Sequence, residues 1–193
     1  MAIPTANFKA EISLELEHIL EYWKTFSVDE EYGGFVGQRD HENQLINGAS
    51  KGAILNTRLL WTFSAVGNFK AEKVGELRKL ADRAYEYLKD HFSDDVHEGI
   101  FWELDAKGVP VNRRKQVYAQ AFAIYALSEY YLLTGVENAK NWALSLFDLL
   151  EQHALDPKEN GYFEAFKEDW APIEDVRLSE KDQNSVKTMN THL

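Results

Sequence analysis

A short motif of glycine and aromatic residues recurs three times along the chain at nearly even spacing. The copies are Gly34-Phe35-Val36, Gly99-Ile100-Phe101-Trp102 and Gly161-Tyr162-Phe163-Glu164, and each gap between them holds two helical patterns. Repeats of this length are typical of arrays in which each unit buries its apolar face only against its neighbours. The sequence therefore predicts an array of helix pairs joined by short extended turns.

The helical segments alternate between two kinds. Residues 8–23, 77–92 and 138–153 each carry one apolar stripe among charged residues, which is typical of helices at a protein surface. Residues 53–66 and 117–127 are apolar nearly all round, apart from one charge in the first of them. We expect these two helices to be buried.

Three turn signals mark the ends of these segments. Ser50 is expected to cap the helix that follows it, and Gly135 is expected to end the helix that begins at residue 117. The tripeptide Ala106-Lys107-Gly108 separates two short extended segments and predicts a hairpin.

An outer, half-exposed helix followed by an inner, buried helix is what a double ring of helices requires. The pattern resembles the all-α (α/α)6 toroid or barrel, which needs six helix pairs, whereas this chain supplies about three with short β-hairpins between them. We therefore interpret residues 1–193 as the N-terminal half of a single (α/α)6-barrel catalytic domain, with residues 183–193 beginning a seventh helix.

The composition of the chain limits the kinds of molecule that it is expected to bind. The 193 residues are 45% hydrophobic and include no cysteine, so the chain can form a sizeable core without disulfides or zinc-thiolate sites. Its net charge of −11 disfavours nucleic acid and acidic membranes. The N-terminus does not resemble a signal peptide and no segment reaches the roughly 20 apolar residues of a membrane span. A soluble cytoplasmic protein is expected.

Polar residues within apolar helices are the first candidates for chemistry, because their burial is costly unless they are paired or used. Arg58 could pair with a carboxylate inside the fold, or it could face the centre of the ring and hold an anionic or oxyanionic group. Tyr118, at the start of the other inner helix, could be a core tyrosine or reach the same cavity.

Aromatic and acidic side chains leave alternatives open. Trp61, Trp102 and Phe122 could stack on sugar faces or belong to the core. Glu103 with Asp105, and Glu164 alone, could serve glycoside hydrolysis, although we expect turn carboxylates in so acidic a chain to be solvated. The histidines expected at surface or satisfied positions, without the spacing of metal ligands, are His18, His41, His91, His97 and His153.

A polar stretch near the C-terminus follows a long loop from Ala165 to Lys181. It begins at Asp182 and contains Asn190 and His192, which together form the densest hydrogen-bonding cluster in the chain. Spacing alone makes this cluster only a weak indication of a site.

Three segments together resemble the N-acylglucosamine 2-epimerase superfamily, and within it the cellobiose 2-epimerases. They are residues 50–64 (SKGAILNTRLLWTFS), residues 117–122 (VYAQAF) and residues 187–193 (KTMNTHL). The resemblance implies an (α/α)6 barrel of about twice this length. It also implies cofactor-independent epimerisation at C2 of a reducing-end sugar, in which one histidine removes the C2 proton and another returns a proton to the opposite face of a cis-enediolate.

The resemblance assigns roles to residues of this chain. Arg58 is similar to the arginine that holds the C1 and C2 oxygens, and His192 belongs to the histidine motif, so these two are the candidate catalytic residues. Tyr118 and Asn190 are similar to substrate contacts, with Asp182 as a supporting partner. In the family the motif continues with a second histidine, which would directly follow Leu193 and would be the acid or base, with His192 as its neighbour. Trp102 and Phe122 complete the candidate substrate-binding set.

The expected substrate is a cellobiose-like disaccharide, and the protein of full length is expected to be a monomer or weak homodimer. Another epimerase or aldose–ketose isomerase of the superfamily, an (α/α)6 glycoside hydrolase and a non-catalytic helical-repeat scaffold remain alternatives. A hydrolase would need paired carboxylates in the cavity, whereas a scaffold would need no arginine within an inner helix.

Overall fold

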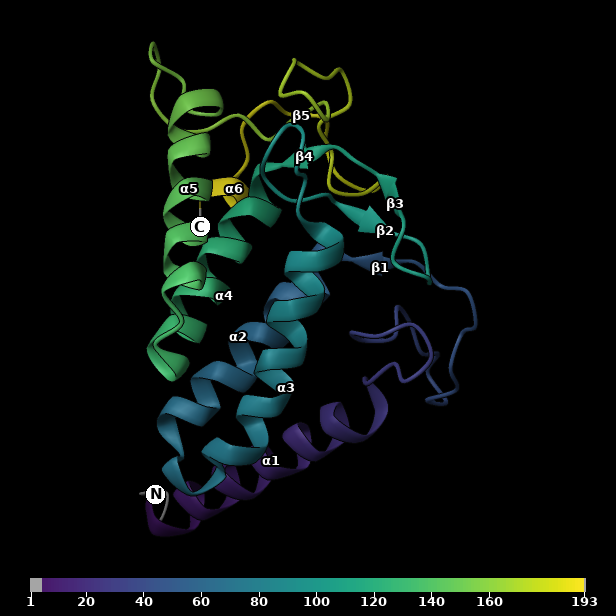
Figure 1. The fold of residues 1–193 in the computed structure, drawn as a ribbon, viewed down its shortest axis with the longest axis vertical. Coiled ribbons are helices and arrows are strands. Elements are labelled where there is room, and N and C mark those ends of the chain that lie inside the picture. Colours follow the sequence, from purple (N-terminus) through teal and green to yellow (C-terminus); the bar gives the residue numbers. More distant parts are fainter. Residues whose placement is uncertain (1–4, 193) are drawn as a thin grey trace.

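The computed structural model describes residues 5–192, and its helices form two layers (Figure 1). The inner layer consists of α2 (Ala53–Phe69) and α4 (Val117–Thr134), which pack against each other. Of the outer helices, α3 (Val74–Tyr87) packs on α2 and α5 (Glu137–His153) packs on α4. The alternation of outer and inner helices predicted from the sequence is therefore confirmed, and it is part of the (α/α)6 arrangement. The remaining helical elements are α1 (Thr5–Phe26), the 3-10 turn η1 (Ala71–Lys73), the π-helical turn η2 (Leu88–Phe92) and α6 (Met189–His192).

Short antiparallel strands join successive repeats. The strands β1 (Lys51–Gly52), β2 (Glu103–Leu104) and β3 (Pro110–Asn112) form one sheet in that order, and β4 (Lys115–Gln116) pairs with β5 (Ala165–Phe166). Lys51 lies opposite Leu104 and Lys115 lies opposite Phe166, at the same place in both sheets. The strand before each of these inner helices thus pairs with the hairpin of the next repeat.

The three predicted turns have the same backbone conformation. Isolated β-bridges join Val28 to Phe35, Ser93 to Ile100 and Leu155 to Tyr162, and two residues with positive φ precede the second residue of each bridge. The residue equivalent to Phe35 is therefore Ile100 in the second turn and Tyr162 in the third. The register of the three turns is set by β-bridge pairing of the backbone and not by which residue is aromatic.

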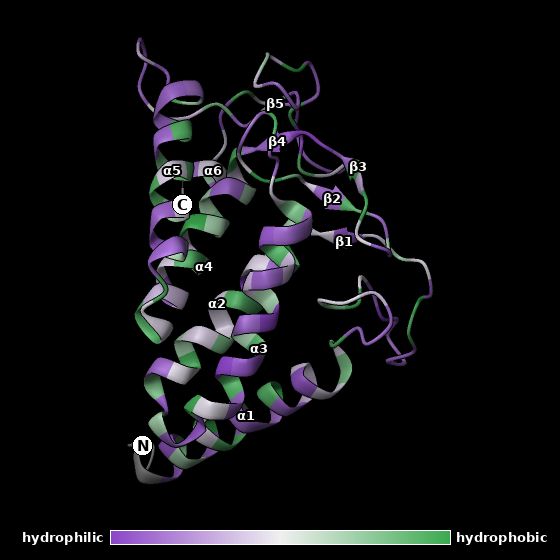
Figure 2. Cartoon of the chain, in the orientation of Figure 1, coloured by the Kyte–Doolittle hydropathy of each residue, from purple (hydrophilic) through white to green (hydrophobic). Residues whose placement is uncertain are grey.

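The apolar stripe of α1 is only partly covered. Leu20 is buried and Leu16 and Trp23 pack beside it against the core, but Phe8 and Ile12 are each 53% exposed. Figure 2 shows hydrophobic and hydrophilic residues alternating along the outer helices α1, α3 and α5. The amphipathic pattern therefore predicted the helix correctly, while the apolar residues near its N-terminal end stay about half exposed.

The expectation that the inner helices are buried on every side is wrong for the described residues. Tyr125 on α4 is 51% exposed and Leu132 is 70% exposed, and Arg58 on α2 is also exposed. These helices bury the sides that meet α3, α5 and each other, but a third side faces away from all three contacts. Arg58 consequently lies on an open face and not inside a packed helix.

The predictions for the ends of the elements are confirmed at some positions and wrong at others. Gly135 adopts φ 72° and ends α4 as expected, and β2 and β3 flank the predicted hairpin turn. Ser50 does not cap α2, because the helix begins after Gly52 and the serine hydroxyl bonds to Glu103 instead. The predicted helix over 183–193 is confined to Met189–His192 among the described residues. No helix within residues 5–192 has the length and hydropathy needed to span a bilayer.

Candidate active site

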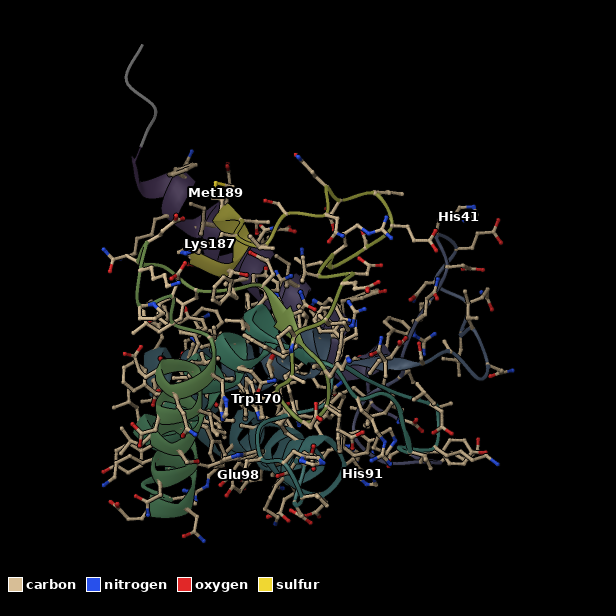
Figure 3. The ribbon with its side chains drawn as sticks, turned by 90° about the horizontal axis from the view of Figure 1, so that it is seen from above. His41, His91, Glu98, Trp170, Lys187 and Met189 are labelled. Atoms are coloured by element: carbon tan, nitrogen blue, oxygen red, sulfur yellow. The ribbon has the colours of Figure 1, made fainter. Side chains whose placement is uncertain are left out.

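An aspartate–lysine ion pair joins each of the three turns to the start of an inner helix. The aspartate follows the outer helix, and the lysine lies two residues before the first residue of the inner helix that comes next. We call these pairs the clamps; they are Asp29–Lys51 at 2.7 Å, Asp94–Lys115 at 2.6 Å and Asp156–Lys187 at 2.6 Å. Seen from above, Figure 3 places Lys187 beside Met189, where α6 begins.

Each clamp aspartate also organises its own turn. Asp94 Oδ1 accepts the backbone N–H groups of Val96 and His97, and Asp29 and Asp156 accept from the residues at the same two positions. The ammonium of Lys187 and these N–H groups lower the pKa of Asp156 to about 2. For Asp94, burial alone would raise the pKa of the carboxyl, but Lys115 and the two N–H groups outweigh burial and lower it.

The clamps give the inner helices a common register. Tyr118 and Asn190 each lie three residues after a clamp lysine, and Arg58 and Phe122 each lie seven residues after one. Positions three and seven share one face of a helix. Four of the residues predicted from the sequence thus lie on the equivalent face of three successive inner helices. We call this face, with the positions three and seven residues after a clamp lysine, the ring-facing side.

Arg58 is the only charged residue of α2, and its side chain is exposed on the open side of the helix. The ion pairs that arginines form among residues 5–192 involve Arg78, Arg83, Arg113 and Arg177. The alternative that Arg58 pairs with a carboxylate inside the fold therefore has no support among the described residues, and the guanidinium is available to a ligand.

Aromatic rings form a continuous row beside Arg58. Trp61, one turn after Arg58, stacks on Tyr125 with ring centroids 5.0 Å apart. Tyr125 contacts Phe122 edge to face, and Phe122 contacts Tyr118 in the same way at 4.8 Å. We call Trp61, Tyr125, Phe122 and Tyr118 the aromatic row. Three of its members are half-buried and Tyr125 is exposed, so the row presents ring surface to solvent.

A cavity of about 300 Å³ lies at the start of α6 and brings two further candidates together. Asp182 and Asn190 both line it, along with Arg177. Asp182 accepts hydrogen bonds from the backbone N–H and the hydroxyl of Ser179, so it stabilises the loop that forms the wall. Asn190 is exposed at the rim.

Trp102 takes a different position. Its side chain is half-buried against the hydrophobic core, and its carbonyl oxygen accepts the N–H of Ala53, the first residue of α2. No ring contact among the described residues joins Trp102 to the aromatic row. It therefore supports the start of the helix that carries Arg58.

Both ring nitrogens of His192 are engaged by the backbone. Nε2 lies 2.9 Å from the N–H nitrogen of Tyr162, and Nδ1 lies 2.7 Å from the carbonyl oxygen of Thr188. Because an α-helix has 3.6 residues per turn, the side chains of Asn190 and His192 are separated by about 200° around the helix axis. The structure thus separates two candidates that are two positions apart in the sequence.

Glu164 has a structural role that the sequence reasoning missed. We expected a solvated turn carboxylate, but Glu164 is buried and its two oxygens accept the N–H of Thr188 and the hydroxyl of Thr191. It therefore holds the start of α6, which carries Asn190. The signal that could have revealed it is its place as the last residue of the third turn motif.

The hairpin carboxylates Glu103 and Asp105 are half-buried and hydrogen-bonded, which corrects the expectation that they are solvated, whereas the histidines lie at the surface or satisfied positions expected. Asp105 accepts the N–H groups of Lys107 and Val109 within the hairpin turn, and Glu103 accepts the hydroxyl of Ser50. His18, His41 and His97 are exposed, whereas His153 stacks on Trp170 at 4.9 Å. Within residues 5–192 no three His, Asp or Glu side chains gather as metal ligands would.

Comparison with known proteins agrees with this geometry. The family model of N-acylglucosamine 2-epimerase (GlcNAc 2-epimerase) matches residues 33–185. A cellobiose 2-epimerase from Bacteroides fragilis is 46% identical over 186 residues, which are 96% of this chain and 47% of that protein. The chain therefore spans about half the length of the curated relatives it matches.

Solved structures show the same relationship. The cellobiose 2-epimerase from Spirochaeta thermophila is 36% identical, with a TM-score of 0.87 over 97% of this chain and 46% of that one. The cellobiose 2-epimerase from Bacillus thermoamylovorans is also 36% identical, with a TM-score of 0.88 over 97% of this chain and 48% of that one. The family match covers most of the chain and includes the Asp94–Lys115 clamp and the helices that carry Arg58 and Tyr118. The chain belongs to the N-acylglucosamine 2-epimerase family.

Proposed function

We propose that this chain is the N-terminal half of a cytoplasmic (α/α)6-barrel isomerase that interconverts glucose and mannose at the reducing end of cellobiose-like β-1,4-linked disaccharides. The observation that carries the proposal is that the exposed Arg58 and the aromatic row lie on one open face of the inner helices. The similarity to cellobiose 2-epimerases supports the choice of substrate.

The reaction requires removal of the proton at C2, next to the C1 carbonyl of the open sugar. That proton leaves only if the negative charge that develops on the oxygens is stabilised and a base lies against the carbon. A guanidinium presents a planar pair of donors that suits two adjacent oxygens. In this proposal Arg58 holds the C1 and C2 oxygens and stabilises the cis-enediolate, and no cofactor takes part.

The other ring-facing positions bind the sugar. Phe122 and Trp61 offer ring faces on which a pyranose can stack, and Tyr118 offers a hydroxyl at the start of α4. Asn190, at the equivalent position of α6, adds an amide at the rim of the cavity that Asp182 lines. These residues fix the reducing end relative to Arg58.

The acid and the base of the reaction belong to histidines outside the described residues. The family motif places a histidine directly after Leu193. The position of that histidine is seven residues after Lys187. Arg58 and Phe122 occupy that position after their own clamp lysines, so this histidine would share the ring-facing side with them.

A glycoside hydrolase on the same fold is the main rival. It would require paired carboxylates facing the substrate, yet Glu103, Asp105 and Glu164 are all engaged in turns or at the start of a helix. The full-length protein should be incubated with cellobiose and the products separated by chromatography. A glucosyl-mannose disaccharide supports the proposal, whereas free glucose indicates hydrolysis and a fructose-ended disaccharide indicates aldose–ketose isomerisation.

A further inference from the structure

In the second and third repeats, the position five residues after the clamp lysine has a role that differs from the ring-facing positions. It is occupied by Gln120 in the repeat of α4 and by His192 in the repeat of α6. Gln120 is completely buried, and its amide exchanges two hydrogen bonds with the backbone of Ile100: Oε1 accepts the N–H and Nε2 donates to the carbonyl, both at 2.8 Å. This side chain fastens the second turn to α4.

His192 makes the equivalent bond in the third repeat. Tyr162 occupies the place of Ile100 in its turn, and its N–H donates to Nε2 of His192. A backbone N–H can only donate and the carbonyl of Thr188 can only accept, so Nε2 must be the acceptor and Nδ1 must carry the hydrogen. The contacts therefore select one neutral tautomer.

The turn glycines provide an independent sign of this arrangement. A Cβ atom added to Gly161 would lie 2.4 Å from Nε2 of His192, and one added to Gly99 would lie 3.1 Å from Oε1 of Gln120. Both glycines also have positive φ, at 77° and 75°. The backbone of each turn thus leaves room for the side chain that comes from the inner helix.

We propose that His192 is a positioning residue, the counterpart of Gln120, which fastens α6 to the third turn and thereby holds Asn190 at the rim of the cavity. His192 neither removes nor returns the proton of the substrate. Because both nitrogens are bound to the backbone and the ring points away from Asn190, the imidazole cannot exchange a proton with a ligand on the ring-facing side.

The inference rests on the proposed function only for its activity test, which uses the full-length enzyme. Glutamine can supply the same acceptor, as Gln120 does, so His192→Gln should keep kcat within about threefold and leave the pH profile of kcat/KM unchanged. His192→Leu removes the acceptor and should raise KM by about tenfold, with a smaller change in kcat, because Asn190 is no longer held. His41→Gln, at an exposed loop histidine far from α6 in Figure 3, is the matched control.

A 100-fold loss of kcat in a natively folded His192→Gln variant would overturn the inference, and so would a His192→Leu variant that equals the wild type. The ring tautomer provides a test that does not depend on activity. Long-range ¹H–¹⁵N correlation spectra of histidine-labelled wild-type protein at pH 7.5 should show hydrogen on Nδ1. Hydrogen on Nε2 would contradict the assignment even if the protein proves not to be an epimerase.

Discussion

Asp94 and Lys115 form an ion pair of 2.6 Å in which both side chains are almost completely removed from solvent, at 2% and 0% exposure. Such a pair is sensitive to the loss of one partner, because the remaining charge has neither water nor a counterion. It joins the turn that follows η2 to the start of α4, and so positions Tyr118 and Phe122.

Replacing Lys115 by methionine should lower the free energy of unfolding by about 3–5 kcal/mol, since the carboxylate of Asp94 would then be buried without its partner. Lys140→Met is the matched control, because Lys140 pairs with Glu137 at the surface, where such pairs contribute at most about 1 kcal/mol. Urea unfolding followed by circular dichroism measures both. Equal destabilisation of the two variants would show that burial of the clamp has no special effect.

The third clamp predicts a specific response to acid. Because the pKa of Asp156 is about 2 in the folded protein, below its value in an unfolded chain, its stabilising effect is complete above about pH 4. This effect should be lost progressively as the pH falls from 4 towards 2. The urea midpoint of the wild type should therefore drop more steeply over this range than that of Asp156→Asn. Parallel curves would mean that the carboxyl is not held by Lys187.

Much of the fold could be predicted from the sequence, because periodic apolar residues and repeated turn motifs are local signals. The spacing of Gly34, Gly99 and Gly161 was enough to indicate helix pairs, and Gly135 marked the end of α4 correctly. Pairing between repeats could not be predicted. The clamps join residues 21 to 31 positions apart, and an isolated lysine or aspartate in an acidic chain gives no sign of its partner.

The site was only partly predictable for the same reason. Arg58 stood out because a charge within an apolar helix is unusual, and the structure leaves it accessible. The roles of Glu164 and His192 depend on the three-dimensional course of the third turn, which places Glu164 beside Thr188 and Tyr162 beside His192. In the sequence, Asn190 and His192 look like one cluster, but helical geometry separates them.

Substituting Arg58 by lysine in the full-length enzyme should lower kcat by about 100- to 1,000-fold, because an ammonium cannot bind two adjacent oxygens as a guanidinium does. Arg78→Lys, on the exposed side of α3, is the control and should leave kcat unchanged. Initial rates with cellobiose measure both variants. A natively folded Arg58→Lys enzyme with the wild-type rate would return Arg58 to a structural role.

The 193-residue chain, prepared alone, should self-associate or bind hydrophobic dyes. Phe8 and Ile12 on α1 and Tyr125 and Leu132 on α4 expose large apolar side chains, and extended apolar surface promotes association. Sedimentation velocity with a dye-binding assay tests this expectation. A compact monomer of 22.2 kDa that binds no dye would show that these faces need no covering partner.

The central claim is that the full-length protein exchanges the proton at C2 of a reducing-end sugar. Incubation with cellobiose in D₂O, followed by NMR of the recovered disaccharides, tests it most directly. The account predicts deuterium at C2 of the reducing residue in both the glucose and the mannose forms, with the β-1,4 bond intact. A mannose form without deuterium at C2, or free glucose with no epimer, would contradict it.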